Sequence, residues 1–541
     1  MSRRGSTDLA MDPEKLDSSR DDNTTLEDKS GVNVVVSQHA TSSPEPAPKV
    51  PTTLAADDPE NPRNWKVSKK VIVNIVVCVW VLSLTFSSTA YVASLPEIVR
   101  RYNISFEVAI LGVTLNIFGF AAGPLLFGPA SEVYGRQAVH RVAGVGYSAF
   151  AFGVAFAPNT PGFLVMRFFD GFFGAASINN GKFGFLSISV YTERPSSAGC
   201  HRRLHHSSST TALLFIVLVL MFLDGTKLTS SDALMAFGGP SLGPLISSFV
   251  QTEAGYRWNL RVIAIFSSVT SLMVAFVPET HGPTLLKWRL QRENKELAPK
   301  TDIKKLMSVL KVAISRPIVY LFTEPVVMLV SIYLSILYGI LYGFFEAFTV
   351  VWVRTRGFSP TSYGLTYISL GLGFLCAITM VVTIGQSMYT KSAAKDKAQG
   401  IPVQPEARLI LGYYGAIMCP ISLFIFAWTA PYKHVHWIAP CIGEFLFSGS
   451  MLLIFTGFIP FLIDCYQLTA ASALAAGMAS RSFVGGIFPL FAIQMFEGLT
   501  VQGATCLLAG IACLCAPIPF IFKRYGTRLR ARSKNAAVQS T

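Results

Sequence analysis

The chain has 541 residues, of which 51% are hydrophobic and 14% are charged. Soluble domains carry roughly 25% charged residues, so this composition excludes a soluble globular protein and indicates a polytopic membrane protein. The formal net charge is +14, although residues 1–70 hold ten Lys and Arg against twelve Asp and Glu. The basic excess therefore lies beside apolar segments, where it indicates membrane topology rather than nucleic-acid binding.

Residues 1–69 are predicted to form a disordered cytoplasmic tail. They are rich in Ser, Thr, Asp, Glu and Pro, and they cannot bury enough apolar surface to offset the entropy lost on ordering. They also lack the basic and then apolar start of a signal peptide. Insertion is therefore expected to begin with the first internal span.

Twelve apolar segments are predicted to be transmembrane helices, because a helix needs about 20 residues to cross the hydrocarbon core. They lie near residues 71–96, 108–130, 140–157, 162–181, 233–250, 260–277, 320–346, 361–385, 409–429, 435–463, 468–495 and 501–522. The expected fold class is an all-α polytopic membrane protein with 12 transmembrane helices.

The connecting loops alternate in charge, as the positive-inside rule requires. A basic central loop at 281–317 and a basic tail at 524–541 would both lie in the cytoplasm with the N-terminus. The central loop divides the chain into two six-helix bundles, 70–280 and 318–523. Repeated six-helix bundles around a site at the membrane midplane are a transporter architecture.

A nine-residue motif, Gly128-Pro-Ala-Ser-Glu-Val-Tyr-Gly-Arg136, joins spans two and three. Its glycines permit a tight turn and close helix approach. Glu132 and Arg136 can form charge-assisted bonds between helices at the membrane edge, which would lock one access state. The predicted gating residues are Gly128, Glu132, Gly135 and Arg136. The alternative is a plain basic topology loop.

This motif resembles the signature loop of the major facilitator superfamily. The segments 58–65, 278–283, 470–476 and 488–491 resemble fungal twelve-span drug:proton antiporters, the branch with polyamine, cycloheximide and azole exporters. The resemblance implies a major facilitator fold and export of small amphipathic drugs, toxins or secondary metabolites, driven by proton entry. No phosphate-binding G-x-x-x-x-G-K-[ST] motif occurs, so we expect a transporter without cofactor or enzymatic activity, energised by the proton gradient.

The fourth span carries Arg167-Phe-Phe-Asp-Gly171, and charges inside a membrane bundle are costly and usually functional. The resemblance assigns Arg167 to proton coupling. Asp170 stands where the family often has a neutral residue, and the i, i+3 spacing lets it pair with Arg167. The alternative is that Arg167 extends to the membrane interface.

The fifth span carries Gly239-Pro-Ser-Leu-Gly-Pro244, which resembles the antiporter motif. Glycine allows close packing and proline removes a helical hydrogen bond. The predicted bend, at which the two bundles would rock, consists of Gly239, Pro240, Gly243 and Pro244. A generic Gly/Pro kink is the alternative.

Span seven shows a stripe at helical spacing that is predicted to line the substrate cavity. The cavity candidates are Tyr338, Tyr342, Phe345 and Glu346 of span seven, together with Asn116 of span two. Aromatic rings and a carboxylate would suit an aromatic or cationic substrate. A packing face is the equal alternative, because Glu346 is expected near the exoplasmic end, where a carboxylate costs little. Asn116 could instead bond a neighbouring helix.

Glu444 on span ten and Arg481 on span eleven are further proton-coupling candidates, expected nearer mid-depth. They could pair with each other, or Arg481 could pair with Asp464. A purely structural pair is an equal alternative.

Residues 181–232 depart from the resemblance. Gly181-Lys-Phe can be encoded GGT AAG TTT, which contains the common intron start GTAAGT, so 182–232 are hypothesised to derive partly from a retained intron. A true cytoplasmic insertion is the alternative. The apolar stretch 212–223 is short for a span, and a span there would invert every later loop. The Cys/His residues of 200–206 lack supporting ligands, so no metal site is expected.

The expected partners are a small-molecule substrate and the lipid bilayer, with no nucleic acid, for a monomer in the plasma membrane. The vacuolar membrane is the alternative location. Asn103 begins a glycosylation sequon in the first exoplasmic loop. The alternative functions are uptake of a polyamine or another nutrient, a non-transporting solute sensor, and an inactive mis-spliced product.

Overall fold

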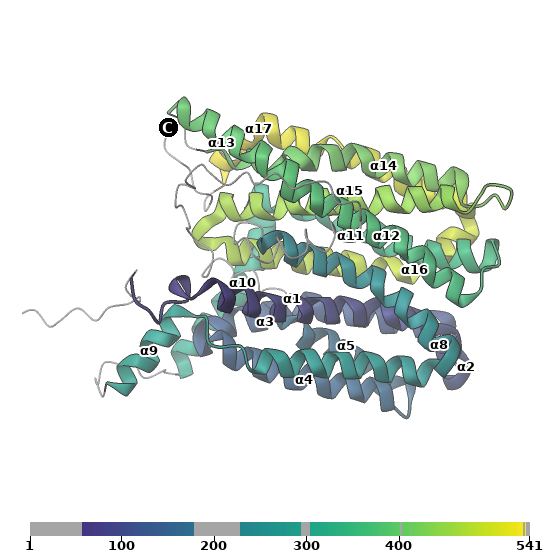
Figure 1. Ribbon diagram of the computed structural model, residues 1–541, viewed down its shortest axis with the longest axis horizontal. Coiled ribbons are helices and arrows are strands. Elements are labelled where there is room, and N and C mark those ends of the chain that lie inside the picture. The colour runs from purple at the N-terminus through teal and green to yellow at the C-terminus, as the bar shows by residue number, and fades with distance from the viewer. Residues whose placement is uncertain (1–56, 178–227, 294–302, 401–402, 534–535, 537–541) are drawn as a thin grey trace, which may run out of the picture. The chain divides into compact units, whose positions relative to one another are not determined.

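A computed structural model describes residues 57–177, 228–293, 303–400, 403–533 and 536, all within one compact unit (Figure 1). The described residues form helices and turns, with no β-strand. Residues 182–227 of the retained-intron hypothesis, residues 1–56 of the predicted tail and the Cys/His segment 200–206 fall outside the described residues. Residues 57–69 of the tail are described and include a short helix, η1, instead of the predicted disorder.

The first half of the chain contains helices α1 to α8. Their bounds are η1 (Pro62–Asn64), α1 (Val67–Ala90), η2 (Tyr91–Ser94), α2 (Leu95–Tyr102), α3 (Phe106–Tyr134), α4 (Arg136–Phe156), α5 (Thr160–Gly174) and α8 (Leu228–Ala275). Within this half, α1 packs on α8, α3 packs on α5, and α4 packs on both α5 and α8.

The second half contains helices α11 to α17, preceded by two helices in the basic central segment. Their bounds are α9 (Gly282–Arg292), α10 (Ile303–Thr323), α11 (Pro325–Phe348), η4 (Thr349–Thr355), α12 (Pro360–Met380), η5 (Val381–Gly385), α13 (Gln386–Ala398), η6 (Pro405–Leu409), α14 (Ile410–Thr429), α15 (Ile438–Tyr466), η7 (Gln467–Thr469), α16 (Ala470–Cys515) and α17 (Ile518–Arg532). Here α11 packs on α16, and α15 packs on α12 and α14, while α3 meets α16 and α8 meets α12 between the halves.

Eight helical stretches among the described residues are long and apolar enough to cross a membrane. Two of them each contain two predicted spans, because α8 is interrupted at Gly255 (φ 79°) and α16 at Thr500 (φ 63°). The helices α4 and α5 cover predicted spans three and four, the latter described as far as Ser177. Each of the twelve predicted spans therefore overlaps a helix among the described residues.

Proline sets the start of the seventh span. The helix α10 ends at Thr323, and Glu324 has an extended backbone (φ −105°, ψ 104°) before Pro325 opens α11. A proline disfavours helical geometry in the residue before it and lacks the N–H of a continuing helix. The predicted span beginning at 320 is therefore split between α10 and α11.

Candidate functional site

Glycines bring α3 and α5 into backbone contact. A Cβ atom on Gly171 of α5 would collide with the carbonyl oxygen of Asn116, and one on Gly119 of α3 would collide with backbone atoms of Phe168 and Phe172. Small residues permit this approach in membrane helices, where close van der Waals packing drives association. The crossing holds Asn116 against the helical turn that carries the charged residues of span four.

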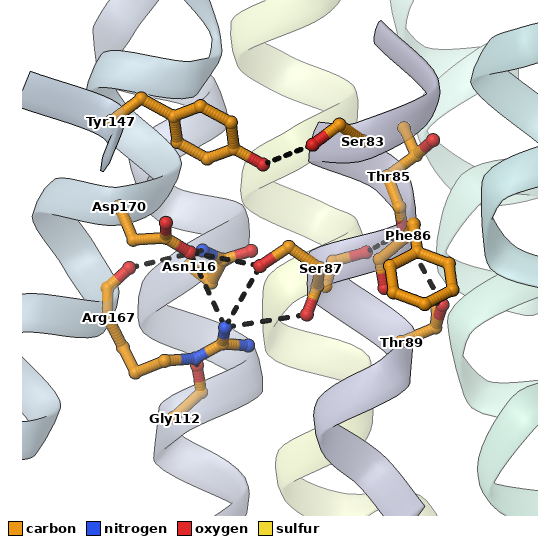
Figure 2. A network of polar contacts seen from close by, with 11 residues as sticks. Ser83, Thr85, Phe86, Ser87, Thr89, Gly112, Asn116, Tyr147, Arg167 and Asp170 are labelled. Atoms are coloured by element: carbon orange, nitrogen blue, oxygen red, sulfur yellow. Dashed lines mark hydrogen bonds and ion pairs between the residues drawn. The ribbon is translucent and has the colours of Figure 1, made fainter. Parts of the chain in front are cut away.

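Arg167 and Asp170 form a buried ion pair at this crossing (Figure 2). Arg167 Nη1 lies 3.5 Å from Asp170 Oδ2, and both side chains are 1% exposed. Ser87 Oγ donates to Asp170 Oδ2 at 3.1 Å, and Asn116 Nδ2 donates to the same oxygen at 3.0 Å. The predicted pairing of Arg167 with Asp170 is present, and Asn116 bonds the neighbouring helix.

The guanidinium of Arg167 is held by α1 and α3 on its other sides. Its Nε donates to the Gly112 carbonyl at 3.1 Å, and Nη1 lies 3.4 Å from the carbonyl and hydroxyl oxygens of Ser87. Its Cζ lies 4.5 Å from the ring centroid of Tyr91. Arg167 therefore does not extend to the membrane interface. Sequence reasoning missed Ser87 and Tyr91, although the cluster of Ser and Thr within an otherwise apolar first span was a signal for Ser87.

Three buried atoms of this network have no hydrogen-bond partner among the described residues. They are Arg167 Nη2, Asp170 Oδ1 and Asn116 Oδ1. The ion pair thus uses one oxygen of Asp170 for all its bonds and leaves the second oxygen unoccupied. A carboxyl group in this arrangement can bind a proton at Oδ1 without first losing a hydrogen bond there.

The predicted gating loop is anchored by a carboxylate that sequence reasoning did not assign to it. Glu279 accepts the backbone N–H groups of Arg136 at 3.1 Å and Gln137 at 3.0 Å, at the N-terminus of α4. Unpaired N–H groups and the helix dipole favour an anion at this position. Gly135 has a φ of 89° and lies so close that a Cβ would collide with the carboxylate of Glu279. The turn therefore requires glycine.

The predicted bond from Glu132 is absent. Glu132 is exposed and forms no hydrogen bond or ion pair with any part of the chain that the structure describes, although its charge and that of Arg136 interact through space. The Arg136 side chain donates from Nη1 to Thr280 Oγ1 at 3.3 Å, and the carbonyl of Gly128 accepts from Ser131 Oγ at 2.7 Å. The acidic contact of the loop comes instead from the segment 278–283, which sequence analysis used only as a family marker.

The motif of span five packs α8 tightly on α1. Cβ atoms on Gly239 and Gly243 would collide with the hydroxyl groups of Thr85 and Thr89. The α8 helix continues through Pro240 and Pro244, and its non-helical residue is Gly255. In this state the two glycines provide close contact, and the interruption of α8 lies further along the chain than the predicted bend.

A second buried polar cluster lies in the C-terminal half. Glu444 is 0% exposed, accepts from Trp352 Nε1 at 2.9 Å and also accepts from Ser369 Oγ. The hydroxyl groups of Tyr363 and Tyr367 lie 2.9 Å apart. Sequence reasoning identified Glu444 but neither of its two partners, which come from η4 and α12.

Glu346 is buried rather than exposed to solvent, where a carboxylate would cost little free energy. Its side chain is 2% exposed, and Oε2 has no hydrogen-bond partner in the described ranges. The expectation that this carboxylate costs little is therefore wrong, because α11 continues directly into η4 and the packed helices enclose it. Tyr342 and Phe345 are buried beside it, with ring centroids 5.8 Å apart.

Arg481 pairs with neither expected carboxylate. Asp464 forms an ion pair with Arg408 at 2.9 Å, and Glu444 is bonded as described above. Arg481 instead faces the rings of Tyr338 and Phe455, each with its centroid 5.6 Å from the guanidinium carbon. Phe455 and Glu444 are eleven residues apart on α15, which is about 16 Å at the α-helical rise. The two candidates thus lie at different depths.

Asn103 is exposed and has a left-handed backbone conformation (φ 49°) at the end of α2. Ser105 of the same sequon caps the N-terminus of α3, where its hydroxyl accepts the N–H of Val108 at 3.4 Å. Glycosylation at Asn103 stays a prediction. Across the described ranges no group of three or more His, Cys, Asp or Glu is arranged to hold a metal ion.

Comparison with known proteins agrees with this architecture. The Major Facilitator Superfamily model matches residues 225–489. The efflux pump FUB11 of Gibberella moniliformis is 34% identical over 494 residues, covering 89% of this chain and 77% of the relative. The multidrug transporter mdrA of Aspergillus fumigatus is 34% identical over 490 residues, 89% of this chain and 75% of the relative. The multidrug transporter TPO1_1 of Candida glabrata is 33% identical over 489 residues, 89% of this chain and 80% of the relative.

Solved structures support the fold. The chain is similar to a D-xylose–proton symporter with a TM-score of 0.56 and 15% identity, covering 83% of this chain and 97% of the other. It is also similar to the xylose transporter XylE of E. coli in a partially occluded inward-open conformation, with a TM-score of 0.55 and 14% identity, covering 84% and 99% of the two chains.

Proposed function

Because this chain is a member of the major facilitator superfamily, a family of membrane transporters rather than enzymes, we propose that it exports small amphipathic organic molecules in exchange for protons. The names of its relatives, efflux pumps and multidrug transporters, support export. The two halves, 70–280 and 318–523, would alternate access around a site between them. Residues 1–69, 281–317 and 524–541 would lie on the cytoplasmic side of the plasma membrane.

The buried pair of Arg167 and Asp170 is the observation that carries proton coupling. Burying an ion pair whose side chains are 1% exposed costs free energy, and removing either partner alone strongly destabilises the protein. Proton binding at Asp170 Oδ1, the unbonded oxygen, would remove the negative charge and leave Arg167 uncompensated. A change of this kind favours a conformation that supplies Arg167 with another partner or with water, and so shifts the population between access states.

The C-terminal carboxylates are secondary proton sites in this proposal. Neither Glu346 nor Glu444 forms an ion pair with a cation in the described structure, and an uncompensated negative charge within a membrane bundle is costly. A carboxyl group in such surroundings is suited to carrying its proton in one access state and releasing it to water in another.

The gating contact would act at the cytoplasmic edge. Glu279 holds the N-terminus of α4 through Arg136 and Gln137, which ties the end of span six to the loop between spans two and three. Breaking these charge-assisted bonds would free the cytoplasmic ends of the helices in the first half. Gly128, Glu132 and Gly135 would complete this loop.

The proposal is tested with purified protein in liposomes loaded with a fluorescent dye, either cationic rhodamine 6G or anionic 2-naphthalenesulfonate, and subjected to an imposed pH gradient. The wild-type protein should move at least one of these dyes against the direction of proton flow, and a protonophore should abolish the movement. In Asp170→Asn the pH gradient should no longer accelerate dye transport. In the control Glu497→Gln, which removes a carboxylate that is 55% exposed, the gradient should still accelerate it. Uphill dye movement in Asp170→Asn equal to that of the wild type would contradict coupling through this pair.

Intact cells distinguish the remaining alternatives. An exporter lowers the cellular content of its substrate, whereas an uptake transporter for polyamines or another nutrient raises it. A solute sensor binds ligand without net flux, and an inactive product shows neither. Sequencing the spliced transcript across codons 175–240 shows whether 182–232 belong to the protein.

A further inference from the structure

Arg481 lies in the middle of the second half and has no anionic partner among the residues that the structure describes. It lies on α16 at the level of Phe455, which is seventeen residues from the start of α15 and eleven from its end. Within the described ranges its one hydrogen bond is from Nη2 to the thioether of Met478 at 3.3 Å, and its buried Nε has no partner there. A guanidinium offers five N–H donors, so most of its capacity is unused.

Other arginines that the structure describes have their charge or donors matched. Arg167 pairs with Asp170 and Arg408 pairs with Asp464. Arg356 donates to four backbone carbonyl groups, those of Thr429, Ala430, Tyr432 and Val435. Arg481 differs from all three, and an unmatched charge at membrane depth is costly and usually marks a functional site.

The carboxylates of the same half are too distant to serve as the partner. Glu346 is eight residues beyond Tyr338 on α11, about 12 Å along the helix. Glu444 is about 16 Å from the level of Phe455 and already accepts two hydrogen bonds. No protein group in the described ranges therefore neutralises Arg481.

Aromatic rings surround this guanidinium. The Tyr338 and Phe455 rings face it directly, and the hydroxyl groups of Tyr338 and Tyr342 lie 3.5 Å apart. Two residues further along α16, Phe483 stacks on Phe118 of α3, with ring centroids 5.4 Å apart. The cation thus lies beside the contact between the two halves, where alternating access would expose and enclose a substrate.

We propose that Arg481 is the counter-ion for an aromatic organic anion, so that the exported molecules carry a carboxylate or sulfonate on an aromatic ring. The planar fork of a guanidinium binds two oxygens of such a group in parallel, and the neighbouring rings stack on the apolar part. This inference rests on the proposed export function and names its substrate class. It replaces the cationic substrate that the span-seven stripe suggested with an anionic one.

The test is a binding assay, which does not require transport. Purified wild-type protein in detergent is titrated with 2-naphthalenesulfonate, with neutral 2-naphthalenesulfonamide and with 2-naphthyltrimethylammonium, and the shift in its thermal midpoint is followed. The sulfonate should bind at least about tenfold more tightly than the other two probes, as expected for one desolvated charged hydrogen-bonding pair. Equal affinities, or a preference for the ammonium probe, would overturn the proposal.

Two variants assign the preference to the residue. Arg481→Gln should lose the preference for the sulfonate while still binding the sulfonamide, and Arg354→Gln, which alters an arginine 47% exposed, should behave as the wild type. Should Arg481→Gln not fold, Arg481→Lys keeps the charge without the fork and should reduce sulfonate affinity severalfold. A sulfonate preference that persists unchanged in both Arg481 variants refutes the assignment.

The flux experiment separates this inference from the proposed function. If the protein moves rhodamine 6G against a proton gradient but shows no preference for the sulfonate, export stands and the substrate class is wrong. If the sulfonate binds through Arg481 but no compound moves, the anion site stands and export is wrong.

Discussion

Asn116 and Asp170 come from different helices and meet through a hydrogen bond of 3.0 Å, with Asn116 fully buried. The bond joins α3 to α5 at the point where Gly171 allows the two backbones to touch. The acceptor oxygen is also the one that faces Arg167, so a single carboxylate oxygen links three helices of the first half. The stability of this half and its proposed response to protons therefore depend on the same carboxyl group.

The first prediction concerns the stability of the Arg167–Asp170 pair. Asp170→Ala should destabilise the protein by roughly 3–5 kcal/mol, because it leaves a buried guanidinium without compensation. The double variant Arg167→Leu with Asp170→Ala should recover part of this loss, since it removes both charges. Thermal unfolding of the single and double variants in detergent measures the difference. Strictly additive losses would show that the two charges are not coupled.

The second prediction concerns the helix crossing itself. Gly171→Ala should destabilise the protein by about 1–3 kcal/mol or more, because the added methyl group meets the backbone of α3 rather than a movable side chain. Gly498→Ala is the matched control, since a Cβ there has open space around it. Comparing the thermal midpoints of the two variants tests the close approach. A loss in Gly498→Ala as large as that in Gly171→Ala would argue against it.

The third prediction separates the two acidic residues near the gating loop. Glu279→Gln should weaken the cap on α4 by about 0.3–1 kcal/mol, the usual size of a charge at a helix terminus, and should shift the protein toward the state open to the cytoplasm. Glu132→Gln should have little effect, because the exposed Glu132 makes no described bond. Labelling of a cysteine introduced at Ala130 with a membrane-impermeant maleimide reports the access state. Increased labelling in Glu132→Gln without an increase in Glu279→Gln would instead assign the gating role to Glu132.

The fourth prediction is a pH dependence from His281, which lies between α8 and α9. Burial, and then the nearby charge of Arg136, lower the pKa of this imidazole below its usual value of 6.5. The unfolded chain therefore binds a proton more readily than the folded protein, and the stability from neutral His281 is present above pH 6.5 and is lost as the pH falls below it. The thermal midpoint should drop between pH 7.5 and pH 5.

His281→Gln isolates this contribution, because glutamine can still bond Thr284, the partner of His281 Nδ1 at 2.8 Å. The variant should lose less stability than the wild type over the same pH interval. Parallel pH profiles for the two proteins would mean that other groups account for the whole effect.

Local features of the sequence were sufficient for the positions of the membrane helices and for one contact of the site. Apolar length determines where a helix can cross the bilayer, and the spacing between Arg167 and Asp170 places the two side chains on one helical face whatever the surrounding fold. Both predictions depend on a single segment of chain, which is why hydropathy and helical periodicity were enough to make them.

The tertiary structure decided which partners those residues meet. Ser87 and Asn116 reach Asp170 from α1 and α3, Glu279 rather than Glu132 caps α4, and Arg481 contacts aromatic rings rather than a carboxylate. These contacts depend on how each helix is rotated about its axis and where it crosses its neighbours. Apolar residues cover most faces of a membrane helix, so its sequence alone leaves that rotation open, and glycine-mediated packing between helices determines it.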